Sequence, residues 1–162
     1  QEWFRFHHVF QHLLQNVLRE STASADIAAI HLRASQWYAE NGLVEEAIRY
    51  ALAAHDSALA VRLIVHNRYA LMNTQQWQRL ARWLQQLPDE IVTESAYLNS
   101  TKAFFEQYHG RTKEMSVHVK RAENVLSSLP VDAEESKIVQ AEIMTLHGVM
   151  DAVRGQPPAG RP

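Results

Sequence analysis

The chain of 162 residues contains no cysteine, which excludes a disulfide framework and a thiolate metal site. Glycine and proline are scarce, at five each, and half of them lie within residues 155–162. No apolar run approaches the roughly 20 residues that cross a bilayer, and no signal peptide is visible. Lysine and arginine are scattered and the net charge is −2. Since a nucleic-acid-binding surface needs a basic stripe, we expect no nucleic acid binding. The missing apolar run predicts no membrane contact, and the absence of cysteine fits a cytoplasmic setting.

Apolar residues recur at helical spacing along almost the whole chain and predict an all-α protein. A short aromatic stretch, Trp3 to Phe6, alternates like a single strand and has no second strand to pair with. The chain therefore resembles a piece of a larger protein. Asp56 is the expected cap of the fourth helix. The expected helices cover residues 9–19, 27–41, 43–54, 58–73, 75–87, 97–108, 112–129 and 130–154.

The helices also repeat. Gly42 and Gly110 lie 68 residues apart (110 − 42), twice the 34-residue period of tetratricopeptide (TPR) helix pairs, and Gln76 lies halfway. Apolar residues follow both glycines at offsets of five, nine and twelve: Ala47, Ala51 and Ala54, then Met115, Val119 and Ala122. After Gln76 the match is weak, because Gln85 and Pro88 occupy two of these offsets. We predict antiparallel helix pairs stacked as a TPR-like array; an unrelated helical bundle with coincident spacing is the alternative.

Five segments follow one another with consistent gaps: 4–10 (FRFHHVF), 31–38 (HLRASQWY), 42–48 (GLVEEAI), 50–56 (YALAAHD) and 84–89 (LQQLPD). In this order they resemble the middle of the MalT-like, ATP-dependent LuxR-type bacterial transcription activators, which belong to the signal-transduction ATPases. The similarity covers most of residues 3 to 130.

The resemblance implies a multidomain regulator that links a nucleotide switch to a sensor superhelix and to self-association. Residues 1–20 would be the C-terminal end of a winged-helix domain, 24–154 a helical arm with TPR-like repeats, and 155–162 an inter-repeat loop or ragged end. The intact protein would bind ATP or ADP with magnesium and hydrolyse ATP slowly. This segment would hold no cofactor, because its sequence has no phosphate-binding loop and no DNA-reading helix. Neighbouring domains, further copies and a small-molecule inducer would be its partners.

The same resemblance suggests one ligand-binding residue. In related ATPases a Met-His-Asp motif contacts the β-phosphate of ADP, and Phe6-His7-His8 is similar to it. His7 would then donate to the phosphate, although His8 stands where the motif has Asp. The alternative is that His7 caps or packs against the winged helix.

The sequence gives little support for a metal site or a catalytic site. His8 and His12 are spaced to share one helix face and form a zinc pair, but no third ligand is near, so we expect no metal site. No G-x-S-x-G elbow is present, and we expect no catalytic residue. The scattered histidines from His55 onward are interpreted as surface or interhelix groups. Trp37, Trp77 and Trp83 are expected in the core, with an aromatic that faces a ligand on the concave side of a TPR-like array as the alternative. Two hypotheses remain: a regulatory segment of an ATP-dependent transcription regulator, and a free-standing TPR-like adaptor that binds a partner peptide or helix.

Overall fold

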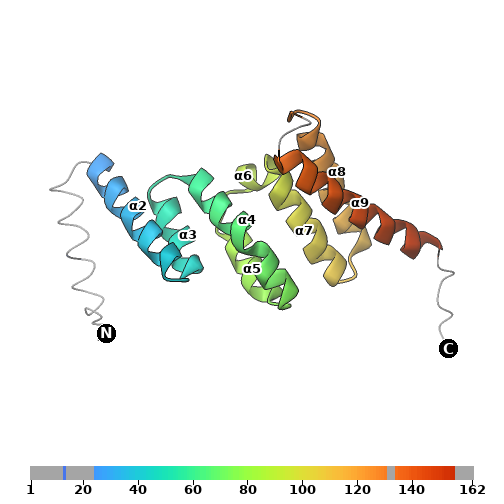
Figure 1. Ribbon diagram of the computed structural model, residues 1–162, viewed down its shortest axis with the longest axis horizontal. Coiled ribbons are helices and arrows are strands. Elements are labelled where there is room, and N and C mark those ends of the chain that lie inside the picture. Colours follow the sequence, from blue (N-terminus) through green and yellow to red (C-terminus); the bar gives the residue numbers. More distant parts are fainter. Residues whose placement is uncertain (1–12, 14–23, 131–133, 156–162) are drawn as a thin grey trace. The chain divides into compact units, whose positions relative to one another are not determined.

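The computed structural model describes residues 13, 24–130 and 134–155. Within these residues the chain forms eight α-helices and no strand, and the predicted all-α class is confirmed. Figure 1 shows how these helices follow one another along the chain. The helices are α2 (Ser24–Glu40), α3 (Val44–Ala53), α4 (Ser57–Asn73), α5 (Trp77–Gln85), α6 (Asp89–Thr93), α7 (Ala96–Tyr108), α8 (Thr112–Leu126) and α9 (Glu134–Gly155).

The expected winged-helix remnant at residues 1–20 lies outside the described residues, apart from the helical Leu13. Residues 156–162 of the expected terminal loop also lie outside them. None of the described helices is both long and apolar enough to cross a membrane.

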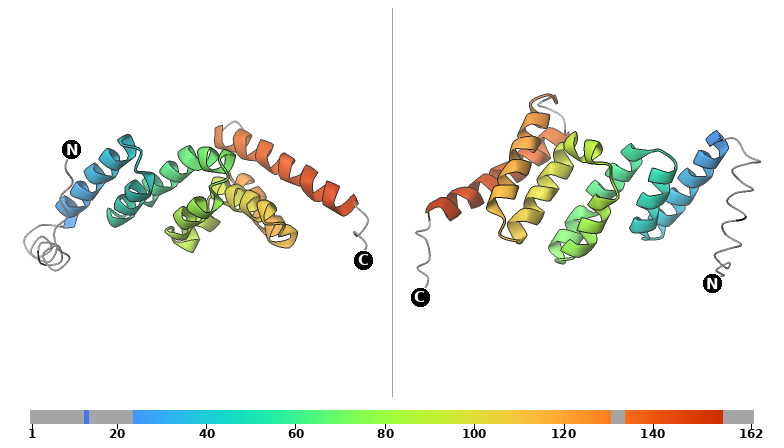
Figure 2. Two further views of the ribbon diagram at one scale, coloured as in Figure 1. Left: turned by 90° about the horizontal axis from the view of Figure 1, so that it is seen from below. Right: turned by 180° about the vertical axis from the view of Figure 1, so that it is seen from behind.

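The chain divides into two compact units, Gln1–Leu63 and Ile64–Pro162. In the first unit, α2 and α3 pack side by side as a helical hairpin (Figure 2). The buried Ser35 hydroxyl on α2 donates to the Ala47 carbonyl on α3 at 2.8 Å. A small polar residue at this position lets the two backbones approach and satisfies its own hydroxyl.

The same turn joins three helix pairs, α2 to α3, α4 to α5 and α7 to α8, and it also links α3 to α4 at His55 (φ 59°, with Asp56 N bonded to Ala51 O at 3.0 Å). Gly42, Gln75 and Gly110 all have left-handed backbones, with φ of 73°, 56° and 70°. In each turn the next residue donates its amide to the carbonyl five positions back, which is the Schellman arrangement that ends a helix. The three bonds are Leu43 N to Tyr38 O (2.9 Å), Gln76 N to Leu71 O (2.8 Å) and Arg111 N to Glu106 O (2.9 Å). The turns are 33 residues (75 − 42) and 35 residues (110 − 75) apart, as expected for a TPR-like array.

The middle repeat was placed one residue too late by the sequence. Its left-handed residue is Gln75 rather than Gln76. Counted from Gln75, offsets five, nine and twelve fall on Leu80, Leu84 and Leu87, and all three are buried. The weak match of this repeat thus disappears. The shift was hidden because glycine, the usual sign of a left-handed turn, is replaced here by glutamine.

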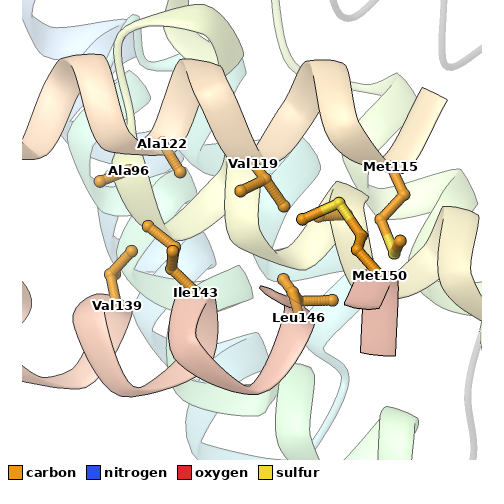
Figure 3. Close-up of a cluster of buried hydrophobic side chains, with 9 residues drawn as sticks. Ala96, Met115, Val119, Ala122, Val139, Ile143, Leu146 and Met150 are labelled. Atoms are coloured by element: carbon orange, nitrogen blue, oxygen red, sulfur yellow. The ribbon is translucent and has the colours of Figure 1, made fainter. Parts of the chain in front are cut away.

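The core of the second unit lies between α7, α8 and α9. Figure 3 shows side chains of α8 pointing toward those of α9, with Val119 facing Ile143 and Leu146. The buried apolar residues of α8 and α9 recur every three or four positions, which places one apolar stripe on each helix. The buried cluster comprises Ala96, Ala103, Met115, Val119, Ala122, Val139, Ile143, Leu146 and Met150.

Helix ends agree with the sequence where a side chain caps them. Asp56 caps α4, because its carboxylate accepts from the Leu59 amide at 2.8 Å. The expected end of α8 at residue 129 was too late, since α8 ends at Leu126. The Ser127 and Ser128 hydroxyls bond to carbonyls of that last turn, which is how serine competes with helix continuation.

Replacing Gln75 by glycine should raise the free energy of unfolding by about 0.5 to 1 kcal/mol. The left-handed backbone costs a non-glycine residue roughly 1 to 2 kcal/mol, and only part of this gain is offset by the entropy of glycine. Urea unfolding measures the effect. Gly110→Ala is the matched control and should be destabilising, because no atom lies within 4 Å of the added methyl and the backbone alone opposes it. Unchanged stability in Gln75→Gly would contradict this account of the turn.

Candidate functional site

An arginine is fully buried in the second unit. Arg68, seven residues before Gln75, occupies the place that Ser35 and Ala103 hold seven residues before Gly42 and Gly110. The exposed fraction of its side chain is 1%. A buried cation is costly unless it is paired and hydrogen-bonded. The second unit supplies both an anion and several acceptors.

The Arg68 guanidinium joins α4 to α7 and α9. Its Nη1 donates to the Tyr97 carbonyl at 2.9 Å and to Thr101 Oγ1 at 2.7 Å, both on α7. Its Nη2 lies 2.6 Å from Glu142 Oε1 on α9. The rings of Tyr69 and Tyr97 lie 4.7 and 4.8 Å from the guanidinium carbon, within cation–π range.

Glu142 is held by two further donors. The Ser100 hydroxyl donates to its Oε2 at 2.5 Å, and the Tyr69 hydroxyl donates to its Oε1. The pKa of the Tyr69 phenol is raised, first by burial and then by this hydrogen bond to Glu142. Of the three guanidinium nitrogens, Nη1 and Nη2 are hydrogen-bonded, and the buried Nε has no partner within the described residues. Since the two charges pair with each other and with neutral groups, we interpret the Arg68 network as a structural clamp and not as a reacting site.

A cleft of about 350 Å³ opens between α5, α6, α7 and α8, and we call it the charged cleft. Its lining combines apolar side chains, including leucine and phenylalanine, with ionisable groups from α6, α7 and α8. Helix α5 and the turn after it contribute Ala81, Leu84, Gln85 and Leu87; α6 contributes Asp89; α7 contributes Lys102, Phe105 and Glu106; and α8 contributes His118.

The charges of this cleft are unevenly paired. Glu106 Oε2 lies 2.5 Å from Arg111 Nε, an ion pair that offsets its charge, although the contact lacks the geometry of a hydrogen bond. Lys102 makes no hydrogen bond or ion pair within the described ranges. Burial lowers the pKa of the His118 imidazole from 6.5 to about 4, and the charges of Lys102 and Arg121 add to this effect. His118 is therefore neutral near pH 7, and its buried Nδ1 has no hydrogen-bond partner in the described part of the chain.

A second cleft of about 270 Å³ lies between the C-terminal ends of α4 and α7 and the start of α5, and we call it the aromatic cleft. Trp77 and Tyr108 stack there with ring centroids 4.7 Å apart, and Tyr108 is 53% exposed. Accessible aromatic rings of this kind are enriched where proteins bind peptides. The lining residues are Met72, Asn73, Trp77, Phe104, Gln107 and Tyr108.

The structure describes only some of the residues that the sequence analysis singled out, and it confirms only part of their expected positions. His7, the expected phosphate contact, and the pair His8 and His12 lie outside the described residues. Trp83 is buried as expected. Trp37 was expected in the core, but 42% of it is exposed, because it lies on the face of α2 opposite Ser35 and α3.

His118 was grouped in the sequence with the scattered surface or interhelix histidines. Only packing shows that it shares a cleft with Lys102 and Glu106, which lie one turn apart on another helix. No spacing in the sequence connects the two helices. Within the described ranges, no three histidine, aspartate or glutamate side chains are grouped to hold a metal ion.

Comparison with known proteins identifies curated relatives but no family model and no solved structure that match. Serine/threonine-protein kinase PknK of Mycobacterium tuberculosis, from strains CDC 1551 / Oshkosh and ATCC 25618 / H37Rv, is 34% identical over 151 residues. The protein of the same name from Mycobacterium bovis shows the same identity. The alignment covers 93% of this chain and 13% of each relative, so the chain spans about an eighth of their length.

The expected membership of the MalT-like LuxR-type activators was wrong. The relatives are named as serine/threonine-protein kinases, and these comparisons offer no evidence of a LuxR-type or MalT-like transcription regulator. The physical reason lies in the segments that suggested the resemblance. Residues 42–48 and 50–56 contain the left-handed turn and the buried alanines of a helical hairpin, features that helical arrays share. The ADP role of His7, which depended on that family, loses its basis.

Glu142→Gln should lower the free energy of unfolding by about 3 to 5 kcal/mol, because it leaves the Arg68 charge buried without its anion. Urea unfolding monitored by circular dichroism measures the change. Glu123→Gln is the matched control, since it removes an exposed carboxylate 2.7 Å from His147 and should change stability by less than about 1 kcal/mol. Equal effects of the two substitutions would show that the buried pair is not a clamp.

The stability of the second unit should decrease between pH 6.5 and about pH 4. The unfolded chain protonates His118 near its ordinary pKa of 6.5, whereas the folded protein protonates it only near 4. Since the unfolded state binds more protons in this window, stability is lost as the pH falls through it. His118→Gln should reduce the slope of unfolding free energy against pH there, by on the order of 1 kcal/mol over the window after allowing for solvent screening. An unchanged slope would mean that His118 is solvated.

Proposed function

We propose that this chain is a non-catalytic helical-repeat segment of a longer signalling protein, which it regulates by binding other segments of that protein. The proposal depends mainly on one observation. Three pairs of α-helices are each joined by the same turn, in which one residue has a left-handed backbone, and two clefts lie beside α7. Repeats of this kind build extended surfaces that hold other polypeptides. The similarity to 13% of a kinase supports a segment of a larger protein.

A kinase catalytic domain is a poor alternative for this stretch. Kinase catalysis needs a glycine-rich loop over the phosphates, a catalytic aspartate and a magnesium-binding aspartate in fixed motifs. The chain contains no G-x-G-x-x-G, no H-R-D and no D-F-G. Its described residues are helical, whereas the glycine-rich loop connects strands. We therefore assign any ATP and magnesium chemistry to other parts of the longer protein, and we place that protein in the cytoplasm.

A free-standing adaptor is the second candidate. It is favoured by the aromatic cleft, where the half-exposed Tyr108 and the Trp77 ring suit an apolar side chain of a separate protein. The two candidates share the binding surface and differ in its consequence. A regulatory segment changes the activity of its own protein, whereas an adaptor only recruits a partner.

Purified chain should not hydrolyse ATP in the presence of magnesium and should not transfer phosphate to a protein substrate. The reason is the absence of the motifs that position nucleotide and metal. A phosphate-release assay and radiolabel transfer measure both reactions against a buffer blank. Turnover that co-purifies with the chain through two chromatographic steps would overturn the proposal.

Regulation is tested by adding the purified chain to the longer protein from which residues 24–155 have been deleted. We expect phosphoryl transfer by the deleted protein to differ from that of the intact protein, and the added chain to restore it at least in part. Binding without any change in rate would favour the adaptor. A deletion that changes nothing, with no binding of the added chain, would contradict both.

A further inference from the structure

We infer that the charged cleft binds an acidic peptide segment, whose carboxylate meets Lys102 while an apolar neighbour packs against the half-buried ring of Phe105. The inference deepens the proposed function and rests on it, because it names the chemistry of the polypeptide that the helical segment holds.

The balance of charge favours an anion. Lys102 has no hydrogen bond or ion pair in the described part of the chain. Arg121 adds a positive charge near His118, but its side chain is exposed and screened by solvent. The charge of Glu106 is already matched by Arg111 at 2.5 Å. Asp89 opposes an anion, but it is exposed at the first residue of α6, where solvent screens it. A ligand carboxylate would give Lys102 the partner that it lacks.

The apolar part of the lining favours a peptide over a free anion. Leu84 and Leu87 are already buried by the protein, whereas Phe105 is only half-buried. A small anion would leave the Phe105 ring in contact with water, and an apolar segment alone would cover Lys102 without pairing it. A peptide that presents one carboxylate next to an apolar side chain satisfies both surfaces. The volume of about 350 Å³ lies at the lower end of typical ligand sites, enough for a few side chains.

The pKa of His118 should report whether a carboxylate is bound in the charged cleft. Its imidazole lines the same cleft as Lys102, and its Nδ1 has no hydrogen-bond partner in the described residues. The charged groups around it are Lys102 and Arg121, which disfavour its protonation, together with the acidic cleft residues Asp89 and Glu106. A bound carboxylate would favour the protonated imidazole and raise the pKa of His118 from about 4.

The binding experiment uses two matched libraries of blocked heptapeptides, one with a central glutamate between apolar residues and one with glutamine at that position. We expect saturable binding from the glutamate library, and at least tenfold weaker binding of the best peptide's glutamine version. Lys102→Glu should weaken binding at least tenfold. Lys137→Glu makes the same charge change at an exposed position of α9 and should leave the affinity within about twofold.

Lys102→Gln, with circular dichroism to confirm folding, separates loss of the site from misfolding. No binder in the glutamate library, equal binding of the glutamine peptide, or unchanged affinity in both Lys102 variants would overturn the inference. The proposed function is tested separately, by the rate of phosphoryl transfer of the longer protein. If that rate responds to the segment but no peptide binds the charged cleft, the proposed function stands and this inference fails.

The site itself is checked by titrating His118 with nuclear magnetic resonance. Saturation with the glutamate peptide should raise the pKa of His118, and the glutamine peptide should raise it less. A glutamate peptide that binds without moving the His118 titration would place the peptide elsewhere and overturn the inference.

Discussion

The buried ion pair between Arg68 and Glu142 is the constraint on which the second unit depends. A guanidinium with 1% of its surface exposed is tolerated only because α7 supplies neutral acceptors and α9 supplies the anion. The pair fixes which residue of α9 faces α4 and α7, something the apolar stripe of α9 specifies only loosely. Buried ionic groups of this type contribute more to a unique arrangement than to net stability, a role we propose for this pair. The apolar cluster between α8 and α9 supplies the bulk of the burial around it.

Helix α7 connects this clamp to both clefts. Ser100 and Thr101 bond to the Arg68 network, and the next residue, Lys102, lines the charged cleft. One turn further, Phe104 and Phe105 line the aromatic and the charged cleft, respectively. A helix held by a buried clamp keeps its neighbouring side chains in fixed positions, which is what a preorganised binding surface requires. The clefts therefore take their geometry from an interaction that lies in neither of them.

The sequence was sufficient for the all-α class, the repeat and most helix ends, because those depend on local periodicity, caps and left-handed glycines. It misplaced the middle turn by one residue, since Gln75 adopts the left-handed backbone conformation that is usually found at glycine. It missed the Arg68 network entirely, because the partner Glu142 lies 74 residues away and no local pattern connects them. The charged cleft was hidden for the same reason, with Lys102 and His118 on different helices. The family was misjudged where packing positions shared by helical arrays were taken for family motifs.

Arg68 also limits how this array can change in evolution. Arrays of equivalent repeats lengthen or shorten readily, because each unit offers its neighbours the same surfaces. The helix pair α4 and α5 is not equivalent to the others, since it carries an arginine where they carry serine and alanine. A duplicated copy of this pair would bury a second guanidinium with no second Glu142 to meet it. A direct copy of this one pair would therefore be destabilising unless its arginine were replaced, whereas the pair α2 and α3, with serine at that place, carries no such constraint.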